Sequence, residues 1–316
     1  MGERALVIRW SAIGDIVMAL PVAASIRASG EHQVAWMADK RFVELVDGHP
    51  FVAKSFSFDR AKYRKSWILP WLWREQLLAY AATREFSPTV AIDLQGHAKT
   101  GLALKFSRAR VRVALDPKDT LAAKYATHIV RTTTIPHAID KNLEALGPCG
   151  FSARSIRFEL QRKQEFNPTG DFVTLHLGTN HPSKQWSIEN FAKVAQSLDL
   201  PILLVGGLSE TDMRDKFFSL GAKATDLTGK LSLRGLSDLL ARSSLHVSCD
   251  TGSAHIAAAF GTPCVTIFGH MPPEQFHPFN QPNAVVSAKG IIGNVSVEMV
   301  LNKIEERLGE RRVEQS

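Results

Sequence analysis

The chain has 316 residues, of which 45% are hydrophobic and 22% charged. This is enough for two domains and excludes a disordered, fibrous or membrane-spanning protein, since no apolar run approaches roughly 18–20 residues. The net charge of +7 lies in the first half, because residues 1–150 carry 21 Lys and Arg against 14 Asp and Glu, whereas residues 151–316 carry 17 of each. Unless these charges are scattered at random, the asymmetry indicates an acidic partner for the first half: nucleic acid, an anionic membrane surface or an acidic substrate.

Apolar runs typical of strands alternate with helical patterns along the whole chain. In the first half, strands are expected at residues 6–10, 34–37, 89–94 and 111–115, and helices at 15–27 and 40–46. A polar stretch at residues 161–170 predicts a domain boundary. After it, strands are expected at 172–177, 201–205, 224–227, 244–249 and 264–268, and helices at 188–198, 211–220, 233–242, 256–260 and 297–308. This pattern predicts two doubly wound α/β halves in tandem, each with a parallel sheet covered on both faces.

The stretch Asp250–His255 lies between the strand 244–249 and the apolar run 256–260. A strand, a polar turn containing Gly252 and then a helix is a geometry in which free N–H groups and the positive end of a helix dipole meet an anion. A capping role for Asp250 and an ordinary first-turn position for His255 explain this stretch equally well on its own.

The loop Ser11–Asp15 follows the first strand, at the carboxyl end where ligands of doubly wound sheets bind. Gly14 permits a tight turn or the close approach of a ligand. Asp15 could act as a general base toward a hydroxyl group. Its spacing alone favours a helix-capping role.

Two loops of the second half also follow predicted strands. The loop 179–186 contains Lys184, which could neutralise a diphosphate as a point charge. Glu210 follows Gly206 and Gly207, and its carboxylate could accept hydrogen bonds from a ribose or a sugar. A solvated lysine and a capping or solvated glutamate are the alternatives.

Residues 60–84 hold six Lys and Arg, one Glu and three tryptophans, Trp67, Trp71 and Trp73. Basic residues beside tryptophans are typical of a membrane interface or of a site for a phosphorylated lipid headgroup. The alternative is a solvated charged face whose tryptophans pack in the core. No helix-turn-helix or zinc-finger pattern accompanies these residues, so no nucleic-acid partner is expected.

Several motifs are absent from the sequence. It contains no GxGxxG, GxxxxGK[ST], Asp-x-Asp or HExxH pattern, so neither a metal nor a cofactor is expected. The N-terminus lacks the features of a secretory signal, and the three cysteines form no CxxC pair. We therefore expect a reducing, cytoplasmic setting.

In their order and spacing these stretches resemble glycosyltransferase family 9, the lipopolysaccharide heptosyltransferases, over nearly the whole chain. The matching marks in the first half are Ser11–Asp15, Ala19–Pro21 and Ile92–Gly96 with Lys99. Those in the second half are Lys184 with Trp186, Gly206–Glu210, Leu227–Gly229, Asp250–His255, Ala257–Ala259, Gly261–Pro263 and Phe268–Gly269. Each mark is weak alone, and together they are specific.

The resemblance implies a GT-B fold, in which two Rossmann-like, doubly wound domains face an interdomain cleft. Residues 1–160 would bind the acceptor and residues 161–316 the donor, with the last helix able to pack back on the first domain. The implied reaction is an inverting, metal-independent transfer of a heptose or related sugar. Its donor would be a nucleotide diphosphate sugar, typically ADP-heptose, and its acceptor a lipopolysaccharide core.

Carried over residue by residue, the resemblance makes Asp15 the general base and Lys184, helped by Thr179, the group that stabilises the departing diphosphate. Glu210 would bind the ribose of the nucleoside. The residues that would hold the sugar and the phosphates are Asp250, Thr251, Gly252 and His255. The basic first half would face an acidic, membrane-held acceptor, with the protein peripheral at the inner face of the inner membrane. Its candidate acceptor contacts are Arg60, Lys62, Arg64, Lys65 and Lys99.

The chain departs from the family pattern at two places. After Phe268 and Gly269 it continues with 270–273, and residues 108–112 lack the Gly-rich turn that the family often has near there. Both departures bear on the identity of the acceptor and of the donor sugar. A family member with another donor sugar, and a two-domain protein that binds a nucleotide or sugar without catalysis, are the alternative hypotheses.

Overall fold

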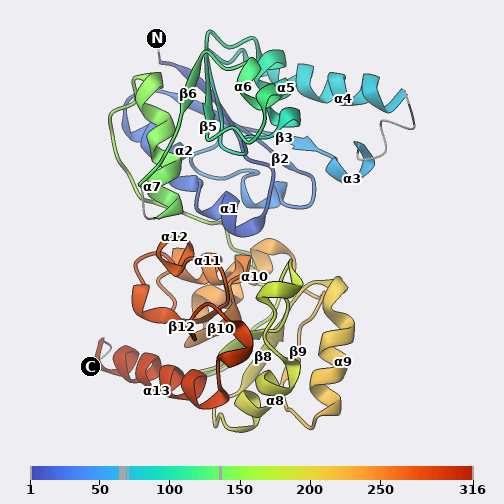
Figure 1. Cartoon of the computed structure of the whole chain (residues 1–316), viewed down its shortest axis with the longest axis vertical. Coiled ribbons are helices and arrows are strands. Elements are labelled where there is room, and N and C mark those ends of the chain that lie inside the picture. Colours follow the sequence, from blue (N-terminus) through green and yellow to red (C-terminus); the bar gives the residue numbers. More distant parts are fainter. Residues whose placement is uncertain (1, 64–68, 70, 135–136, 315–316) are drawn as a thin grey trace. The chain divides into compact units, whose positions relative to one another are not determined.

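The computed structural model describes residues 2–63, 69, 71–134 and 137–314 (Figure 1). Contacts between residues divide the chain into two units, Met1–Glu159 and Leu160–Ser316, each built around one six-stranded parallel sheet. Within the described residues, no helix combines the length and the apolar character needed to cross a membrane.

The strands of the first unit are β1 (Arg4–Ile8), β2 (Gln33–Asp39), β3 (Lys54–Phe58), β4 (Val90–Asp93), β5 (Val111–Leu115) and β6 (His128–Val130). Its α-helices are α1 (Ile13–Val17), α2 (Leu20–Ala28), α3 (Arg60–Tyr63), α4 (Trp71–Ala82), α5 (Ala98–Ser107), α6 (Thr120–Lys124) and α7 (Ala138–Leu143). Short 3₁₀ helices are η1 (Val43–Leu45), η2 (Thr83–Phe86) and η3 (Glu144–Cys149).

The strands of the second unit are β7 (Val173–His176), β8 (Ile202–Val205), β9 (Thr225–Asp226), β10 (Leu245–Cys249), β11 (Cys264–Phe268) and β12 (Val285–Ser287). Its α-helices are α8 (Ile188–Gln196), α9 (Thr211–Ser219), α10 (Leu233–Arg242), α11 (Gly252–Ala259), α12 (Pro273–Phe276) and α13 (Val297–Glu314). The 3₁₀ helices are η4 (Pro182–Lys184), η5 (Leu208–Glu210), η6 (Pro282–Ala284) and η7 (Ile292–Asn294).

The two sheets have the same topology. Their strand orders are β3-β2-β1-β4-β5-β6 and β12-β11-β10-β7-β8-β9, and every neighbouring pair is parallel. Numbered within each unit, both follow the Rossmann order 3-2-1-4-5-6. The central strands β1, β4, β8 and β10 are almost wholly buried, as strands covered on both faces must be. The predicted class of two doubly wound α/β units is confirmed.

The cores show which helices cover each sheet. In the first unit, Leu72 and Tyr80 of α4 and Ala103 of α5 pack with Trp10 and Phe58 on one face of the sheet, while α2 contacts both β2 and α7. In the second unit, side chains of α8, α9 and α13 share one core with β7, β10 and β11. A smaller core joins α10 to β8 on the opposite face.

The helix expected at residues 15–27 is wrong as a single element. The structure contains α1 and α2 separately, with Pro21 in the first turn of α2. Proline has no N–H to donate and its ring collides with the preceding turn, so it suits a helix start and interrupts a continuous helix. The expected helix at 40–46 is reduced to the 3₁₀ turn η1.

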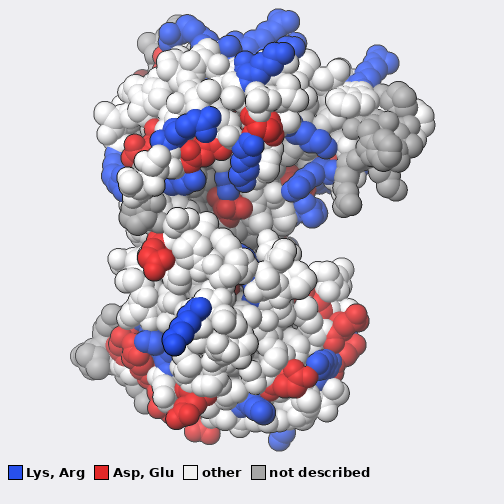
Figure 2. Space-filling model, in the orientation of Figure 1, with Lys and Arg blue, Asp and Glu red and all other residues white. Residues whose placement is uncertain are grey.

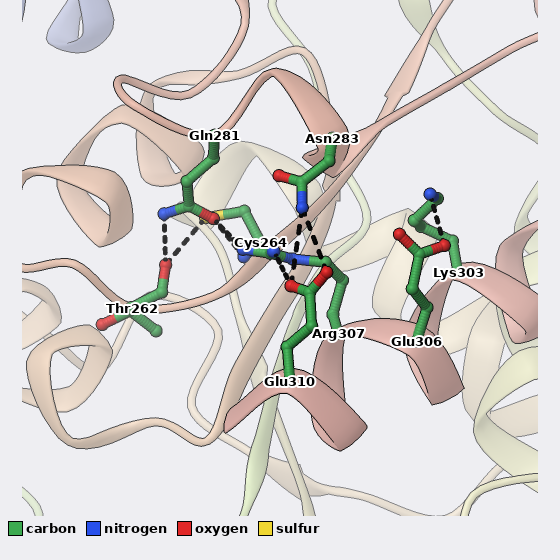
Figure 3. Close-up of polar contacts among 8 residues, drawn as sticks. All are labelled: Thr262, Cys264, Gln281, Asn283, Lys303, Glu306, Arg307 and Glu310. Atoms are coloured by element: carbon green, nitrogen blue, oxygen red, sulfur yellow. Dashed lines mark hydrogen bonds and ion pairs between the residues drawn. The ribbon is translucent and has the colours of Figure 1, made fainter. Parts of the chain in front are cut away.

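Helix α13 is joined to the amino end of β11 by a buried polar network (Figure 3). Gln281 Nε2 donates to the Thr262 carbonyl (2.8 Å), while its Oε1 accepts from the N–H of Cys264 (2.9 Å) and from Arg307 Nη2 (2.7 Å). Arg307 also pairs with Glu310 on the same helix. Because Cys264 begins β11, this network lies at the end of the sheet opposite to the carboxyl edge.

Candidate functional site

The carboxyl edges of the two sheets are the places to look for a ligand. In an open doubly wound sheet, ligands bind beyond the carboxyl ends of the strands, where the strand order reverses. That point lies between β1 and β4 in the first unit and between β7 and β10 in the second.

Asp15 lies at the carboxyl edge of the first sheet, in the third position of α1. Its Oδ2 accepts the N–H of Ala12 (2.8 Å), and its Oδ1 pairs with Nη2 of Arg9 (2.5 Å). The side chain is 35% exposed. A carboxylate offers about four acceptor positions, so each oxygen can still accept a further hydrogen bond from solvent or a ligand. Asp15 therefore caps its helix and also faces solvent, which leaves both sequence interpretations in place.

The end of β4 closes the other side of this edge. Gln95 Oε1 accepts the N–H groups of Trp10 (3.1 Å) and Ser11 (3.3 Å), which ties the two loops together. Asp93 Oδ1 accepts the N–H groups of Gln95 and Gly96, but its Oδ2 has no hydrogen-bond partner among the described residues. Burial raises the pKa of the Asp93 carboxyl to about 6.

Basic side chains surround this edge. Arg60 Nη1 donates to Ser11 Oγ (3.2 Å). Burial and then the charge of Arg60 lower the pKa of the Lys99 ammonium, and burial and then Lys118 lower that of the His97 imidazole. Positive charges that lower the pKa of a neighbouring basic group form a site that is favourable for an anion.

The other predicted acceptor contacts are Lys62, Arg64 and Lys65. Lys62 forms an ion pair with Glu75 of α4, while Arg64 and Lys65 lie outside the described residues, as does Trp67.

Lys and Arg side chains are prominent over the first unit in Figure 2, whereas the second unit shows both signs of charge. Residues 1–159 carry a net charge of +8 and residues 160–316 a net charge of −1.

In the second unit, Lys184 and Asp250 meet at the carboxyl edge. Lys184 ends η4 in the loop after β7, Asp250 directly follows β10, and Lys184 Nζ donates to Asp250 Oδ2 at 2.5 Å. Asp250 is buried, and the Lys184 side chain is 20% exposed. The pair thus holds Lys184 at the edge, where its side chain remains partly exposed.

The amino end of α11 begins beside this pair. Thr251 is its N-cap residue, and the Thr251 side chain makes no capping hydrogen bond. The first N–H groups of a helix have no acceptor within the helix, and they carry the positive end of its dipole. With Gly252 as the first helical residue, backbone can approach an anion closely here. His255 is buried in the same first turn.

Glu210 lies at the same edge, at the end of η5. Its carboxyl group covers Gly178 and Gly206, and a Cβ atom on either glycine would overlap it. His176 Nε2 is hydrogen-bonded to both Glu210 oxygens, at 3.0 and 3.2 Å. The two glycines and the histidine therefore fix where this carboxylate lies.

The remaining predicted donor residue, Thr179, is engaged within its own loop. Its Oγ1 donates to the carbonyl of His181 at 2.8 Å, and the side chain is half-buried. This contact shapes the loop that leads to Lys184. Lys184, Glu210, Asp250, Thr251, Gly252 and His255 all follow the carboxyl ends of β7, β8 or β10.

Sequence reasoning missed four polar residues: Arg9, His176 and Ser253 at these edges, and His246, which is buried below the second edge. His176 and His246 occur inside strand-like runs, where a histidine reads as a core residue. Position could have identified two of the four, because Arg9 and His176 both lie at the carboxyl end of a buried strand.

The chain is similar in sequence to known proteins. The family model of glycosyltransferase family 9 (heptosyltransferase) matches residues 80–299. Lipopolysaccharide heptosyltransferase 1 of Escherichia coli (strain K12) is 22% identical over 315 residues, covering 95% of this chain and 99% of that protein.

Two solved structures show a similar fold. Escherichia coli heptosyltransferase WaaC with ADP has a TM-score of 0.80 at 21% identity, covering 96% of this chain and 99% of that one. The glycosyl transferase family 9 protein from Veillonella parvula DSM 2008 has a TM-score of 0.81 at 18% identity, covering 98% and 97%. The predicted GT-B fold class is confirmed by these likenesses.

Proposed function

Because this chain belongs to glycosyltransferase family 9, we propose that it is an inverting glycosyltransferase that transfers a heptose from ADP-heptose to a lipopolysaccharide core. The observation that carries the proposal is the Lys184–Asp250 pair beside the amino end of α11, with Glu210 fixed at the same edge. This arrangement combines a cation and backbone donors for a diphosphate with a carboxylate for a ribose.

The donor side of the proposal rests on the second unit. Lys184 and the first N–H groups of α11 take the diphosphate, which gains negative charge as its bond to the sugar breaks. Glu210 accepts hydrogen bonds from the ribose hydroxyls, while Asp250 orients Lys184. A protein ammonium and helix N–H groups supply the positive potential here, and the proposed transfer requires no divalent metal.

The acceptor side rests on the first unit. Asp15 takes the proton of the attacking hydroxyl through a lone pair not used by Ala12 or Arg9. Arg60 and Lys99 attract the acidic groups of the acceptor to the same edge. The requirement of this proposal is that Asp15 and Lys184, from different units, act on opposite faces of one sugar.

The reaction then balances as a single displacement. The acceptor oxygen forms a bond to the anomeric carbon as the bond between that carbon and the diphosphate oxygen breaks. The hydroxyl proton passes to Asp15, and the electron pair of the broken bond leaves with the diphosphate. Attack opposite to the leaving group inverts the configuration at the anomeric carbon.

We further propose that the protein acts in the cytoplasm, at the inner face of the inner membrane, and binds that surface transiently through α4. Trp71, Trp73 and Leu78 of α4 are 62%, 46% and 59% exposed, so for the two described tryptophans the core-packing interpretation is wrong. Arg74 directly follows Trp73 on the same helix and is also exposed. Indole rings beside cations suit the headgroup region of an anionic bilayer.

Vesicle sedimentation tests the membrane proposal. Replacing Trp71 and Trp73 by serine is expected to weaken binding to vesicles of phosphatidylglycerol and phosphatidylethanolamine several-fold, because two interfacial anchors are lost. Leu220→Ser, at an exposed apolar residue of the second unit, is the matched control. Equal binding by the double variant and the control would contradict the role of α4.

The proposed activity is tested by mass spectrometry of product formed from ADP-heptose and a heptose-free lipopolysaccharide core. A screen of other nucleotide sugars beside it distinguishes a family member with another donor. Binding of ADP without turnover of any donor would favour the alternative, a protein that binds a nucleotide or sugar without catalysis.

A further inference from the structure

A continuous chain of side-chain hydrogen bonds runs through the second unit and ends at Glu210. Thr174 Oγ1 is 3.0 Å from His246 Nδ1, and His246 Nε2 is 2.9 Å from Ser253 Oγ. Ser253 Oγ is in turn 2.7 Å from His176 Nδ1, and His176 Nε2 is 3.0 Å from Glu210 Oε2. The chain joins β7, β10, α11 and η5, four of the elements around the proposed donor site.

The inner part of this chain is sealed from solvent. Thr174 and His246 are fully buried and Ser253 is 2% exposed. Burial, followed by the nearby imidazole of His176, lowers the pKa of His246 to about 3, so that ring is neutral and carries a single N–H. Because a hydroxyl also carries only one proton, each link can be donated from one side only.

The last link is fixed by the carboxylate of Glu210, which has no proton to donate when it is ionised. If His176 is neutral, Thr174 donates to His246, His246 to Ser253, Ser253 to His176 Nδ1, and His176 Nε2–H to Glu210. If His176 is cationic, the bonds on its Nδ1 side run the opposite way, and Nε2 still donates to Glu210. In both arrangements an ionised Glu210 accepts from Nε2–H, and no polar atom of the chain lacks a partner.

From this geometry we infer that His176 is a positioning residue for Glu210, held in orientation by Ser253 and His246. The inference deepens the proposed function, since it rests on Glu210 as the contact for the donor ribose. Ser253 is also the second residue of α11, whose amino end is the proposed diphosphate site. The two ends of the donor site are thereby linked through one hydroxyl and one imidazole.

A pair of substitutions separates the two nitrogens of His176. His176→Gln keeps an N–H group near the position of Nε2 and loses the contact to Ser253, whereas His176→Asn keeps the Nδ1 side and loses the donor to Glu210. Isothermal titration calorimetry with ADP and with 2′,3′-dideoxy-ADP measures the contribution of the ribose hydroxyls. The wild-type protein is expected to prefer ADP by about tenfold or more, as for hydrogen bonds to a charged group.

The expected pattern distinguishes positioning from packing. His176→Asn should bring the preference for ADP close to one, His176→Gln should keep most of it, and Ser253→Ala should lie between them. His49→Asn, at a buried histidine of the first unit that bonds the Phe158 carbonyl, should leave the preference unchanged. Equal preferences in the two His176 variants would overturn the inference, because loss of packing alone would affect both.

Two further results separate failure of the proposed function from failure of the inference. A wild-type protein that fails to bind ADP contradicts the proposed function itself. Nitrogen-15 chemical shifts of the imidazoles then test the relay without any ligand: they should show a proton on Nε2 of His176 in the wild type. A His176 ring whose only proton is on Nδ1 would overturn the inference.

Discussion

The carboxyl edges of the two sheets have the same strand order, yet their charged groups are paired differently. At the first edge, Asp15 is matched by Arg9, but within the described residues neither Arg60 nor Lys99 forms an ion pair, and Arg60 lies close enough to Lys99 to lower its pKa. At the second edge, Lys184 is matched by Asp250 and Glu210 by His176. We propose that topology determines where a ligand binds, whereas the pairing of charges determines which ligand it is.

The difference has a mechanistic meaning. An edge with unbalanced cations gains most from an external anion, which fits an acidic acceptor that binds by electrostatic attraction. An edge whose groups already hold one another in place is preorganised, so a donor finds its contacts without much rearrangement. The following substitutions test this contrast, from the largest expected effect to the smallest.

Asp15→Asn should reduce turnover about a thousandfold, since a general base contributes roughly 10²–10⁴. The binding of ADP should be unchanged, because Asp15 belongs to the first edge. Steady-state rates together with calorimetry separate the two effects. Glu85→Gln, at an exposed carboxylate paired with Lys54, is the control. A variant that retains full turnover would remove Asp15 from the role of base.

Asp93→Asn should stabilise the protein at pH 7.5 by up to about 3 kcal/mol, because the carboxyl pKa is raised from 3.8 to about 6. The folded state then binds the proton more tightly than the unfolded state. The stabilising contribution of the protonated Asp93 carboxyl is therefore fully present below about pH 4. It is lost as the pH rises through about 6, and it is absent at higher pH. Urea unfolding at pH 7.5 and at pH 4 measures the difference, which should vanish at pH 4. A variant less stable than wild type at pH 7.5 would show that the charge is compensated.

Lys184→Ala should weaken ADP binding and lower kcat, with kcat/KM for the donor falling about a hundredfold. The ammonium contacts charge that is present in the bound donor and increases in the transition state. Lys184→Arg should recover part of the loss, since it restores the charge with a different shape. Lys193→Ala, at an exposed lysine of α8, is the control. A change in KM alone would exclude a role in stabilising the leaving group.

Lys99→Ala should raise the KM for the lipopolysaccharide acceptor about tenfold and leave ADP affinity unchanged. The effect should shrink at high ionic strength, because attraction to an exposed anion is screened by salt. Lys105→Ala, on the same helix α5, is the matched control. An effect of Lys99→Ala on ADP binding rather than on the acceptor would reverse the assignment of the first edge.

The central strands could be predicted from the sequence, and of the four edge strands only β9, expected at residues 224–227, could be. Strand β8 is a continuous apolar run, and β10 and β11 are mostly apolar; all three are buried, which their sequences indicate directly. Strands β3, β6 and β12 lie at the edges of the sheets and are short and partly exposed. Their pairing depends on the neighbouring strand, and that dependence leaves little trace in a local pattern.

Some residues of the candidate site could likewise be predicted from the sequence, and others could not. Residues in loops after predicted strands, such as Asp15, Lys184 and Glu210, could be singled out from their position. The link from His246 through Ser253 to His176 could not, because it joins residues up to 77 positions apart and two of them look like ordinary strand residues. Side-chain partners of this kind become visible only when the sheet brings β7 beside β10.

The bare backbone beneath Glu210 has a consequence for any survey of variants. Alanine at Gly178 or Gly206 would place a methyl group where the carboxyl group now lies. Such a change would displace the Glu210 carboxylate from its position, although neither glycine carries a reactive group. Two positions with no functional group at all should therefore score among the least tolerant in a mutational scan selected for nucleotide recognition.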